Sequence, residues 1–306
     1  MSTQNLFNKR TFTFIFTVAC VPLLCLITIL PTYAQTKGTT KVPFKKDRFN
    51  RIFLPAKIDQ DTVSLLFGTY SKTLRLTPYF LETQSLYPGW GRLTTIDTKG
   101  KRHSKTLFYL PKLQIGSVKF RNEETVVNQA FPDSVATGSI GTLMVYQYNW
   151  KIDNDRNEMT ISKAPFAAER TFTTISYKNN NYPTAVVNIG KINSEFVLDL
   201  GSGAGFQVSS RTALGRAIIE DLNLEPSRVV TSNIHTSKSV DTIYEVVVPS
   251  LVFNGITLKD QKITISSEAP HNTIGTGFLG NYNVIMNNSK KRKVESAIIL
   301  EKRLVD

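Results

Sequence analysis

The sequence predicts an all-β fold made of two similar lobes, which we interpret as the product of an internal duplication. Most of the chain consists of short runs rich in Val, Ile, Thr, Phe and Tyr, in which apolar and polar residues alternate between turn residues. This alternation is typical of strands that have one face on a core. Helical patterns are few and short. Three blocks of sequence also occur twice, in the same order and at nearly constant separation, which indicates a repeat.

The chain begins with a segment that is typical of exported proteins. Lys9 and Arg10 precede an uncharged run over residues 11–30, and small residues follow at the positions that a signal peptidase reads. We expect residues 1–34 to be a signal peptide and the protein to be periplasmic or extracellular. The length of the run leaves a second interpretation open, in which residues 11–30 remain as a membrane anchor.

Composition narrows the chemistry that the mature chain can carry. Both cysteines, Cys20 and Cys25, lie in the predicted signal segment, which excludes a disulfide framework, a thiol nucleophile and a thiolate metal site. The histidines have no spacing typical of metal ligands, so we expect neither a metal nor another cofactor. The formal net charge of +13 falls to +11 without Lys9 and Arg10, which favours anionic partners such as a cell-envelope surface. No pattern indicates nucleic-acid binding.

The repeated blocks predict a first lobe over residues 35–164 and a second over residues 165–306, joined near residues 162–174. The first block is an apolar strand with the loop after it, and the second is an alternating strand before a glycine turn. The third is an apolar strand end followed by a short helix and a Tyr-Asn strand. The paired blocks are residues 58–71 with 189–202, 110–115 with 248–253, and 140–149 with 274–283.

Between the blocks the sequence predicts two hairpins and one longer helix. Residues 92–101 form the first expected hairpin and residues 150–161 the second, each with polar turn residues at its centre. Ser209-Ser210 is expected to cap a helix over residues 211–221.

The loop Asp199-Leu200-Gly201-Ser202, which follows an apolar strand, is the strongest candidate for chemistry. A glycine at position 201 allows a tight turn that brings its backbone N–H toward the Asp199 carboxylate. The Ser202 hydroxyl is expected to donate to the outer carboxylate oxygen. The same place in the first copy reads Gly68-Thr69-Tyr70-Ser71. A glycine therefore stands where the acid should be, and a tyrosine where the glycine should be.

Together, the repeat and this loop resemble the two-lobed aspartic proteases of the retropepsin and pepsin superfamily, and in particular bacterial exported aspartyl-protease-like proteins. The resemblance covers the chain from about Val42 to Leu300. It implies that each lobe contributes one loop to the lobe interface, braced by a second strand end that crosses behind it. Segments 88–108 and 228–244 fall where the family carries flap hairpins. The expected bracing residues are Ile140, Gly141, Ile274 and Gly275.

The mechanism of this family needs two carboxylates that share one proton, so that one acts as the acid and the other as the base. Asp199 supplies one carboxylate, and Gly68 and Tyr70 occupy the place of its partner. Leu200 also lacks the hydroxyl that braces the opposing loop in the family, whereas Thr69 retains it.

Two functions stay open from the sequence. The first is an exported pseudoprotease whose inter-lobe cleft binds a peptide or protein segment in extended form. The alternative is an active aspartic endopeptidase in which Asp199 from each of two copies completes the dyad in a homodimer. For Asp199 itself, the non-functional interpretation is a buried remnant that only hydrogen-bonds its own loop.

Overall fold

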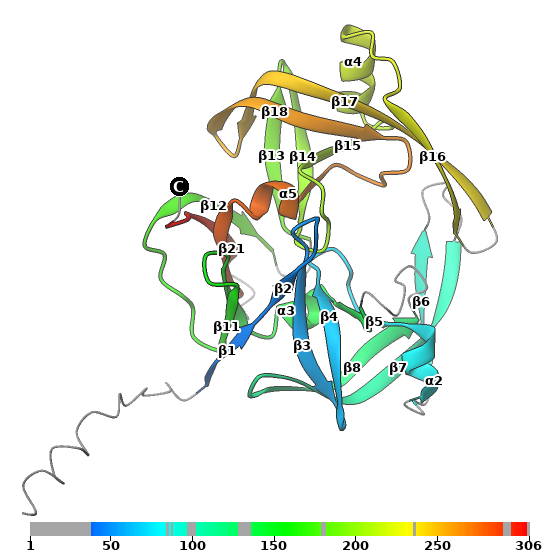
Figure 1. Cartoon of the computed structure of the whole chain (residues 1–306), viewed down its shortest axis with the longest axis vertical. Helices are drawn as coiled ribbons and strands as arrows, with labels where there is room; N and C mark the ends of the chain where they lie inside the picture. The colour runs from blue at the N-terminus through cyan, green and yellow to red at the C-terminus, as the bar shows by residue number, and fades with distance from the viewer. Residues whose placement is uncertain are drawn as a thin grey trace, which may run out of the picture. The chain divides into compact units, whose positions relative to one another are not determined.

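The computed structural model describes residues 38–83, 86, 88–96, 102–127, 136–178, 182–234, 237–289 and 295–304 (Figure 1). Strands dominate these residues, and the all-β prediction is confirmed. The predicted signal segment, residues 1–34, lies outside them. Within the described part of the chain, no helix is long and apolar enough to cross a membrane.

The strands form three sheets. In spatial order, the first holds β2 (Lys45–Lys46), β3 (Ile52–Ile58), β4 (Asp61–Phe67), β9 (Gly138–Ile140), β5 (Leu74–Leu76), β8 (Val118–Val127), β7 (Arg102–Ile115) and β6 (Pro88–Ile96). The second holds β13 (Thr184–Ile189), β14 (Ile192–Asp199), β19 (Thr273–Gly275), β15 (Phe206–Ser209), β18 (Ile256–Ser266), β17 (Ser237–Phe253) and β16 (Arg228–Ile234). The third holds β1 (Thr39–Pro43), β11 (Glu158–Ser162), β10 (Asn149–Asp153), β20 (Tyr282–Asn287), β21 (Ser296–Lys302) and β12 (Thr171–Tyr177). The described helices are α2 (Pro78–Thr83), α3 (Thr142–Val145), α4 (Ala213–Asp221) and α5 (Thr276–Leu279).

The first two sheets share one order of pairing. Apart from β2, each strand of the first sheet has a counterpart in the same place in the second, from β3 and β13 to β6 and β16. The short strand β9 runs parallel to β4 and antiparallel to β5. Likewise, β19 runs parallel to β14 and antiparallel to β15. The repeated sequence blocks therefore fall at matching places in the two sheets.

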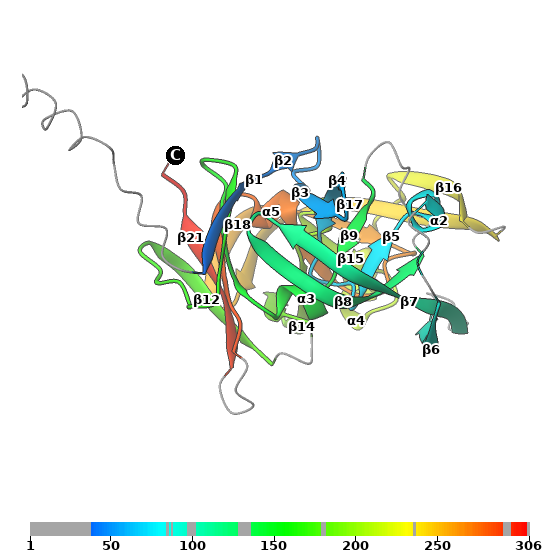
Figure 2. The ribbon, with the colours of Figure 1, turned by 90° about the horizontal axis from the view of Figure 1, so that it is seen from below.

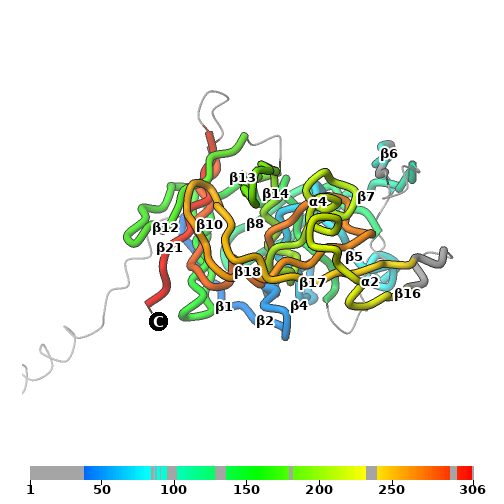
Figure 3. The backbone as a smooth tube through the Cα atoms, turned by 90° about the horizontal axis from the view of Figure 1, so that it is seen from above, coloured from blue at the N-terminus to red at the C-terminus, as the bar shows by residue number. Residues whose placement is uncertain are grey.

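The third sheet combines strands from both predicted lobes. It takes β1, β10 and β11 from the first and β12, β20 and β21 from the second, and β10 pairs with β20. This sheet lies at one end of the unit that residues 38–306 form, whereas the hairpins β6–β7 and β16–β17 project at the other (Figures 1 and 2). The backbone trace shows the same separation (Figure 3). The boundary between residues 35–164 and 165–306 stays a prediction.

A buried tryptophan links the third sheet to the start of the Gly68 segment. Trp150, on β10, donates its indole N–H to the carbonyl of Val145 at 2.7 Å. Its ring lies 5.2 Å from the ring of Phe67, the residue before Gly68. Both side chains are fully buried, and each such burial contributes about 1.5–3 kcal/mol. The end of β4 is therefore held by the core.

Most local predictions agree with the structure, with one correction. The hairpin over residues 150–161 is confirmed as β10–β11. The hairpin at residues 92–101 pairs β6 with β7, but its turn lies outside the described residues. A helix near residues 211–221 is confirmed as α4, but the predicted cap is wrong. Thr212 caps it instead, because its hydroxyl accepts from the N–H of Gly215 at 3.1 Å and a serine cap would have placed the start too early.

An ion pair joins the β10–β11 turn to the segment that follows β21. The Asp155 carboxylate, in the β10–β11 turn, accepts from Arg303 Nε at 2.7 Å, from Asn283 Nδ2 at 2.9 Å and from the N–H of Leu304 at 3.1 Å. Burial acts to raise the pKa of this carboxyl, but these donors outweigh it and lower the pKa to about 2. The side chain is 7% exposed.

We therefore expect Asp155 to make stability depend on acid pH. The pKa in the fold, about 2, lies below the unfolded value of about 3.9. The contribution is present above the unfolded pKa and is lost as the pH falls toward the folded one. Asp155→Asn should lower the free energy of unfolding by roughly 2 kcal/mol at pH 7 and by progressively less in acid, as measured by chemical denaturation.

The matched control is Glu158→Gln, which removes an exposed ion pair with Lys41. Its cost should stay below about 1 kcal/mol. An equal loss of stability in both variants would contradict the role given to Asp155.

Candidate functional site

The site forms where two loops meet. The Asp199 loop (Asp199–Ser202) follows β14, and the Gly68 loop (Gly68–Ser71) follows β4. The two loops touch through glycine backbone, because a Cβ atom built on Gly201 would lie 3.1 Å from the Cα of Gly68. The sequence positions that the repeat pairs are therefore neighbours in space.

One hydroxyl fastens the two loops together. Thr69 is fully buried and donates its hydroxyl to the carbonyl of Leu198 at 2.7 Å. The same hydroxyl oxygen accepts from the N–H of Leu200 at 3.0 Å. Leu200 is also buried but offers no hydroxyl in return. The brace therefore runs in one direction, from the Gly68 loop to the Asp199 loop.

The expected bracing residues lie behind the loops. Asp199 is in register with Gly275 on β19, and Phe67 with Ile140 on β9. A Cβ on Gly275 would come within 2.5 Å of the carbonyl oxygen of Ser202, so only glycine allows this approach. Gly141 is similarly constrained, since a Cβ there would lie 2.4 Å from a carbonyl oxygen of the segment after the Gly68 loop. Ile274 is fully buried beside Leu198.

Backbone donors hold the Asp199 carboxylate from one side. Its Oδ1 accepts from the N–H of Gly201 at 2.8 Å and from the N–H of Thr69 at 3.4 Å. The expected hydrogen bond from Ser202 is not formed. The Ser202 hydroxyl oxygen accepts from the N–H of Ala204 at 3.3 Å.

Burial dominates the ionisation of Asp199. Desolvation raises the pKa of this carboxyl above its ordinary value, and the N–H groups of Gly201 and Thr69 and the charge of Arg75 only partly offset it. Among the described residues, no second carboxylate is among the groups that act on Asp199. Nor does this part of the chain contain a cluster of three His, Cys, Asp or Glu side chains that could hold a metal ion.

A Cβ atom would fit at Gly68, where the family has its first acid. A Cβ built on Gly68 would meet its nearest atoms at 3.5 and 3.9 Å, which is ordinary van der Waals contact. Tyr70, which stands where the family has glycine, turns its ring to the second half of the chain. Its centroid lies 4.7 Å from the ring of Tyr182 and 4.2 Å from that of His271. Burial lowers the pKa of His271, so this imidazole is neutral at pH 7.

Arg75 is a member of this site that the sequence reasoning missed. It lies on β5 between the buried Leu74 and Leu76. Burial lowers the pKa of its guanidinium, and the negative charge of Asp199 acts in the opposite direction. The signal that could have found it is a lone arginine within an apolar strand directly after the loop. We refer to Asp199, Arg75, Tyr70, Tyr182 and His271 as the Asp199 site.

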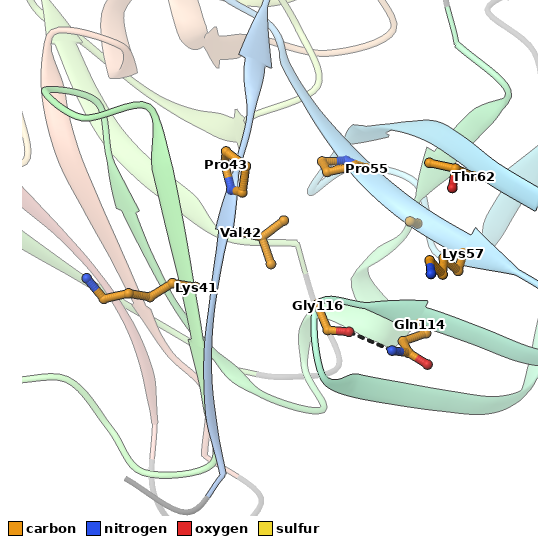
Figure 4. Close-up of a pocket in the computed structure, with 9 residues that line it drawn as sticks. Lys41, Val42, Pro43, Pro55, Lys57, Thr62, Gln114 and Gly116 are labelled. Carbon is orange, nitrogen blue, oxygen red and sulfur yellow. Dashed lines mark hydrogen bonds between the residues drawn. The ribbon is translucent and has the colours of Figure 1, made fainter. Parts of the chain in front are cut away.

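A surface pocket of about 290 Å³ lies elsewhere, beside β1, β3 and β7 (Figure 4). Gln114 donates its side-chain amide to the carbonyl of Gly116 at its edge, at 2.7 Å. The Lys41 ammonium points away from the other lining side chains and pairs with Glu158. None of the lining residues belongs to the Asp199 site.

Comparison with known proteins assigns this chain to no family. A scan of protein-family models found no match to this sequence, and no curated protein matched it.

The two hydrogen bonds of the Thr69 hydroxyl predict that Thr69→Val and Thr69→Ser differ clearly in their free energies of unfolding. Thr69→Val keeps the shape but removes both hydrogen bonds, which leaves the Leu200 N–H and the Leu198 carbonyl buried without partners. We expect a loss of about 2–3 kcal/mol in the free energy of unfolding. Thr69→Ser keeps the hydroxyl and should cost clearly less. Equal stabilities of the two variants in chemical denaturation would refute the brace.

The raised pKa of Asp199 predicts that the substitution Asp199→Asn raises the melting temperature at pH 7. Because the folded pKa lies above the unfolded one, this carboxyl favours the fold when protonated and destabilises it when ionised. Asn retains the acceptor for the Gly201 N–H. Asp199→Asn should therefore melt at a higher temperature than wild type at pH 7. The gain should shrink as the pH falls through the folded pKa, and a more stable wild type at pH 7 would contradict this assignment.

Proposed function

We propose that this chain is an aspartic-protease-fold protein that binds a peptide segment at the Asp199 site and, as a monomer, does not hydrolyse it. The observation that carries the proposal is the pairing of Asp199 with Gly68 rather than with a second carboxylate. The carboxylate accepts from the N–H groups of Gly201 and Thr69, and Gly68 lies against Gly201.

The fold part of the proposal rests on the match between the first two sheets. Strand order, the parallel pairings of β9 and β19 and the position of the loops agree in both. Two-lobed aspartic proteases have this kind of duplicated architecture with one loop from each lobe at the interface. We therefore keep the division into two lobes, with residues 162–174 as their connection.

The chemistry of the site favours binding over hydrolysis. Cleavage by an aspartic dyad needs one carboxyl to receive a proton from water while the other delivers one. Asp199 cannot take both roles in the same step. Arg75 is the positive group whose charge acts on Asp199. Its guanidinium does not release its proton in proteins. Asp199 and Arg75 can instead hold a ligand by charge and hydrogen bonds.

The hairpins suggest how an extended segment could be held. Within the described residues, β6 pairs only with β7, and β16 only with β17. Each hairpin therefore has an outer edge with unpaired backbone groups, which can add a further strand. The first hairpin also reaches the site, since the charge of Arg75 acts on Lys105 of β7.

The alternative is an active endopeptidase formed by a homodimer. It requires Asp199 of one copy to face Asp199 of another, and the Gly68 loop of the same chain already occupies that face through Thr69. Export and contact with an anionic cell-envelope surface remain part of the proposal, on the strength of residues 1–34 and the net charge of +13.

Hydrolysis and binding can be separated with one set of variants. We expect the purified protein to cleave no member of an internally quenched peptide library between acid and neutral pH. The matched positive control is the double variant Gly68→Asp, Tyr70→Gly, which supplies the missing acid and glycine where a Cβ fits. Wild-type cleavage that disappears in Asp199→Asn would overturn the proposal. If such cleavage also rose with the square of the protein concentration, it would establish the homodimer instead.

A further inference from the structure

Arg75 has no hydrogen-bonding or ion-pairing partner among the residues that the structure describes. Its Nε is buried, and its N–H donates to no acceptor within this part of the chain. The guanidinium forms neither a hydrogen bond nor an ion pair with any residue there, and Asp199 acts on it only through its charge. Arg75 as a whole is only partly buried. Unpaired buried charge is costly, and structures rarely keep it without a use.

The charges around Arg75 favour an anion. Lys105 contributes a second positive charge, and burial together with the charge of Arg75 lowers the pKa of its ammonium group. Within the described part of the chain, Asp199 is the carboxylate whose charge acts on Arg75. Its inner oxygen Oδ1 is already occupied by the N–H groups of Gly201 and Thr69. The charge of Arg75 therefore acts on one further cation, Lys105, and on one carboxyl, Asp199, whose pKa is raised by burial.

The rings beside Arg75 suit a planar ligand group. Tyr70 packs on Tyr182, and the Tyr182 side chain is 37% exposed. Guanidinium and carboxylate groups are both planar and pair through two parallel hydrogen bonds. An aromatic surface next to such a pair shields it from water and strengthens it.

We propose that the Asp199 site recognises peptides by a carboxylate, which Arg75 binds. This inference rests on the proposed function and specifies its ligand: an acidic peptide, in which the carboxylate belongs to a Glu or Asp side chain or to the C-terminus. Lys105 adds attraction, and the free oxygen of Asp199 takes a donor from the peptide backbone.

The test uses the purified protein with four matched pools of short peptides randomised over Ala, Val, Thr and Tyr. The pools carry either Glu or Gln at a central position and either a free or an amidated C-terminus. Bound fractions are measured by equilibrium dialysis and mass spectrometry. Wild type should bind at least one carboxylate-bearing pool about tenfold more tightly than the neutral Gln-amide pool. Selection by the central Glu identifies the side chain, and selection by the free terminus identifies the C-terminus.

Two variants separate Arg75 from general charge. Arg75→Gln should lose the preference for carboxylates but still bind the neutral pool, and it should melt no lower than wild type because no hydrogen bond is lost. Arg121→Gln removes the same charge from an exposed position on β8 and should keep the preference. Equal binding of all pools by wild type, or an unchanged preference in Arg75→Gln, would overturn this inference and leave peptide binding intact. Failure to bind any pool would overturn the proposed function itself.

Discussion

The hydroxyl of Thr69 is the contact on which the arrangement of the site depends. It donates to the carbonyl of Leu198 and accepts from the N–H of Leu200, so it fixes the backbone on both sides of Asp199. The residue before its own loop, Phe67, is anchored in the core against Trp150. The position of the carboxylate thus depends on the packing of Phe67 against Trp150, through the loop that carries Thr69. Because Leu200 returns no hydroxyl, the N–H of Thr69 is left to the Asp199 carboxylate.

This one-sided brace explains the character of the site. In a paired site, two carboxylates divide the roles of acid and base by shifting each other's pKa values. Here burial raises the pKa of a single carboxyl, and the backbone N–H groups and the charge of Arg75 lower it only in part. Among the described residues, no second carboxylate acts on Asp199. A partly buried carboxyl beside an unpaired guanidinium is instead suited to holding a ligand with its own charge.

How much of this the sequence could predict depends on the range of the interactions. Strand alternation can be followed along the chain, and it led to the all-β class and to the β10–β11 hairpin. The meeting of the Asp199 and Gly68 loops was expected from the resemblance to two-lobed aspartic proteases. Arg75 was not predicted as a site residue because the pairing of β5 with β8 and β9 creates its environment, and no local sequence pattern reveals that pairing. The Ser202 hydroxyl was misassigned because its direction depends on the exact loop geometry, in which its oxygen accepts from the N–H of Ala204. The helix cap moved to Thr212 because adjacent hydroxyl residues compete for the same role.

The central claim is that Asp199 titrates alone. It can be tested by following the side-chain carboxyl ¹³C shift of Asp199 by NMR as a function of pH, with Gly68→Asp as the reference for a paired site. The account predicts a single protonation step for wild type, with a pKa above that of an ordinary aspartate, and two coupled steps for Gly68→Asp. Two coupled steps in the wild-type protein would show a second carboxylate beside Asp199 and would contradict the account.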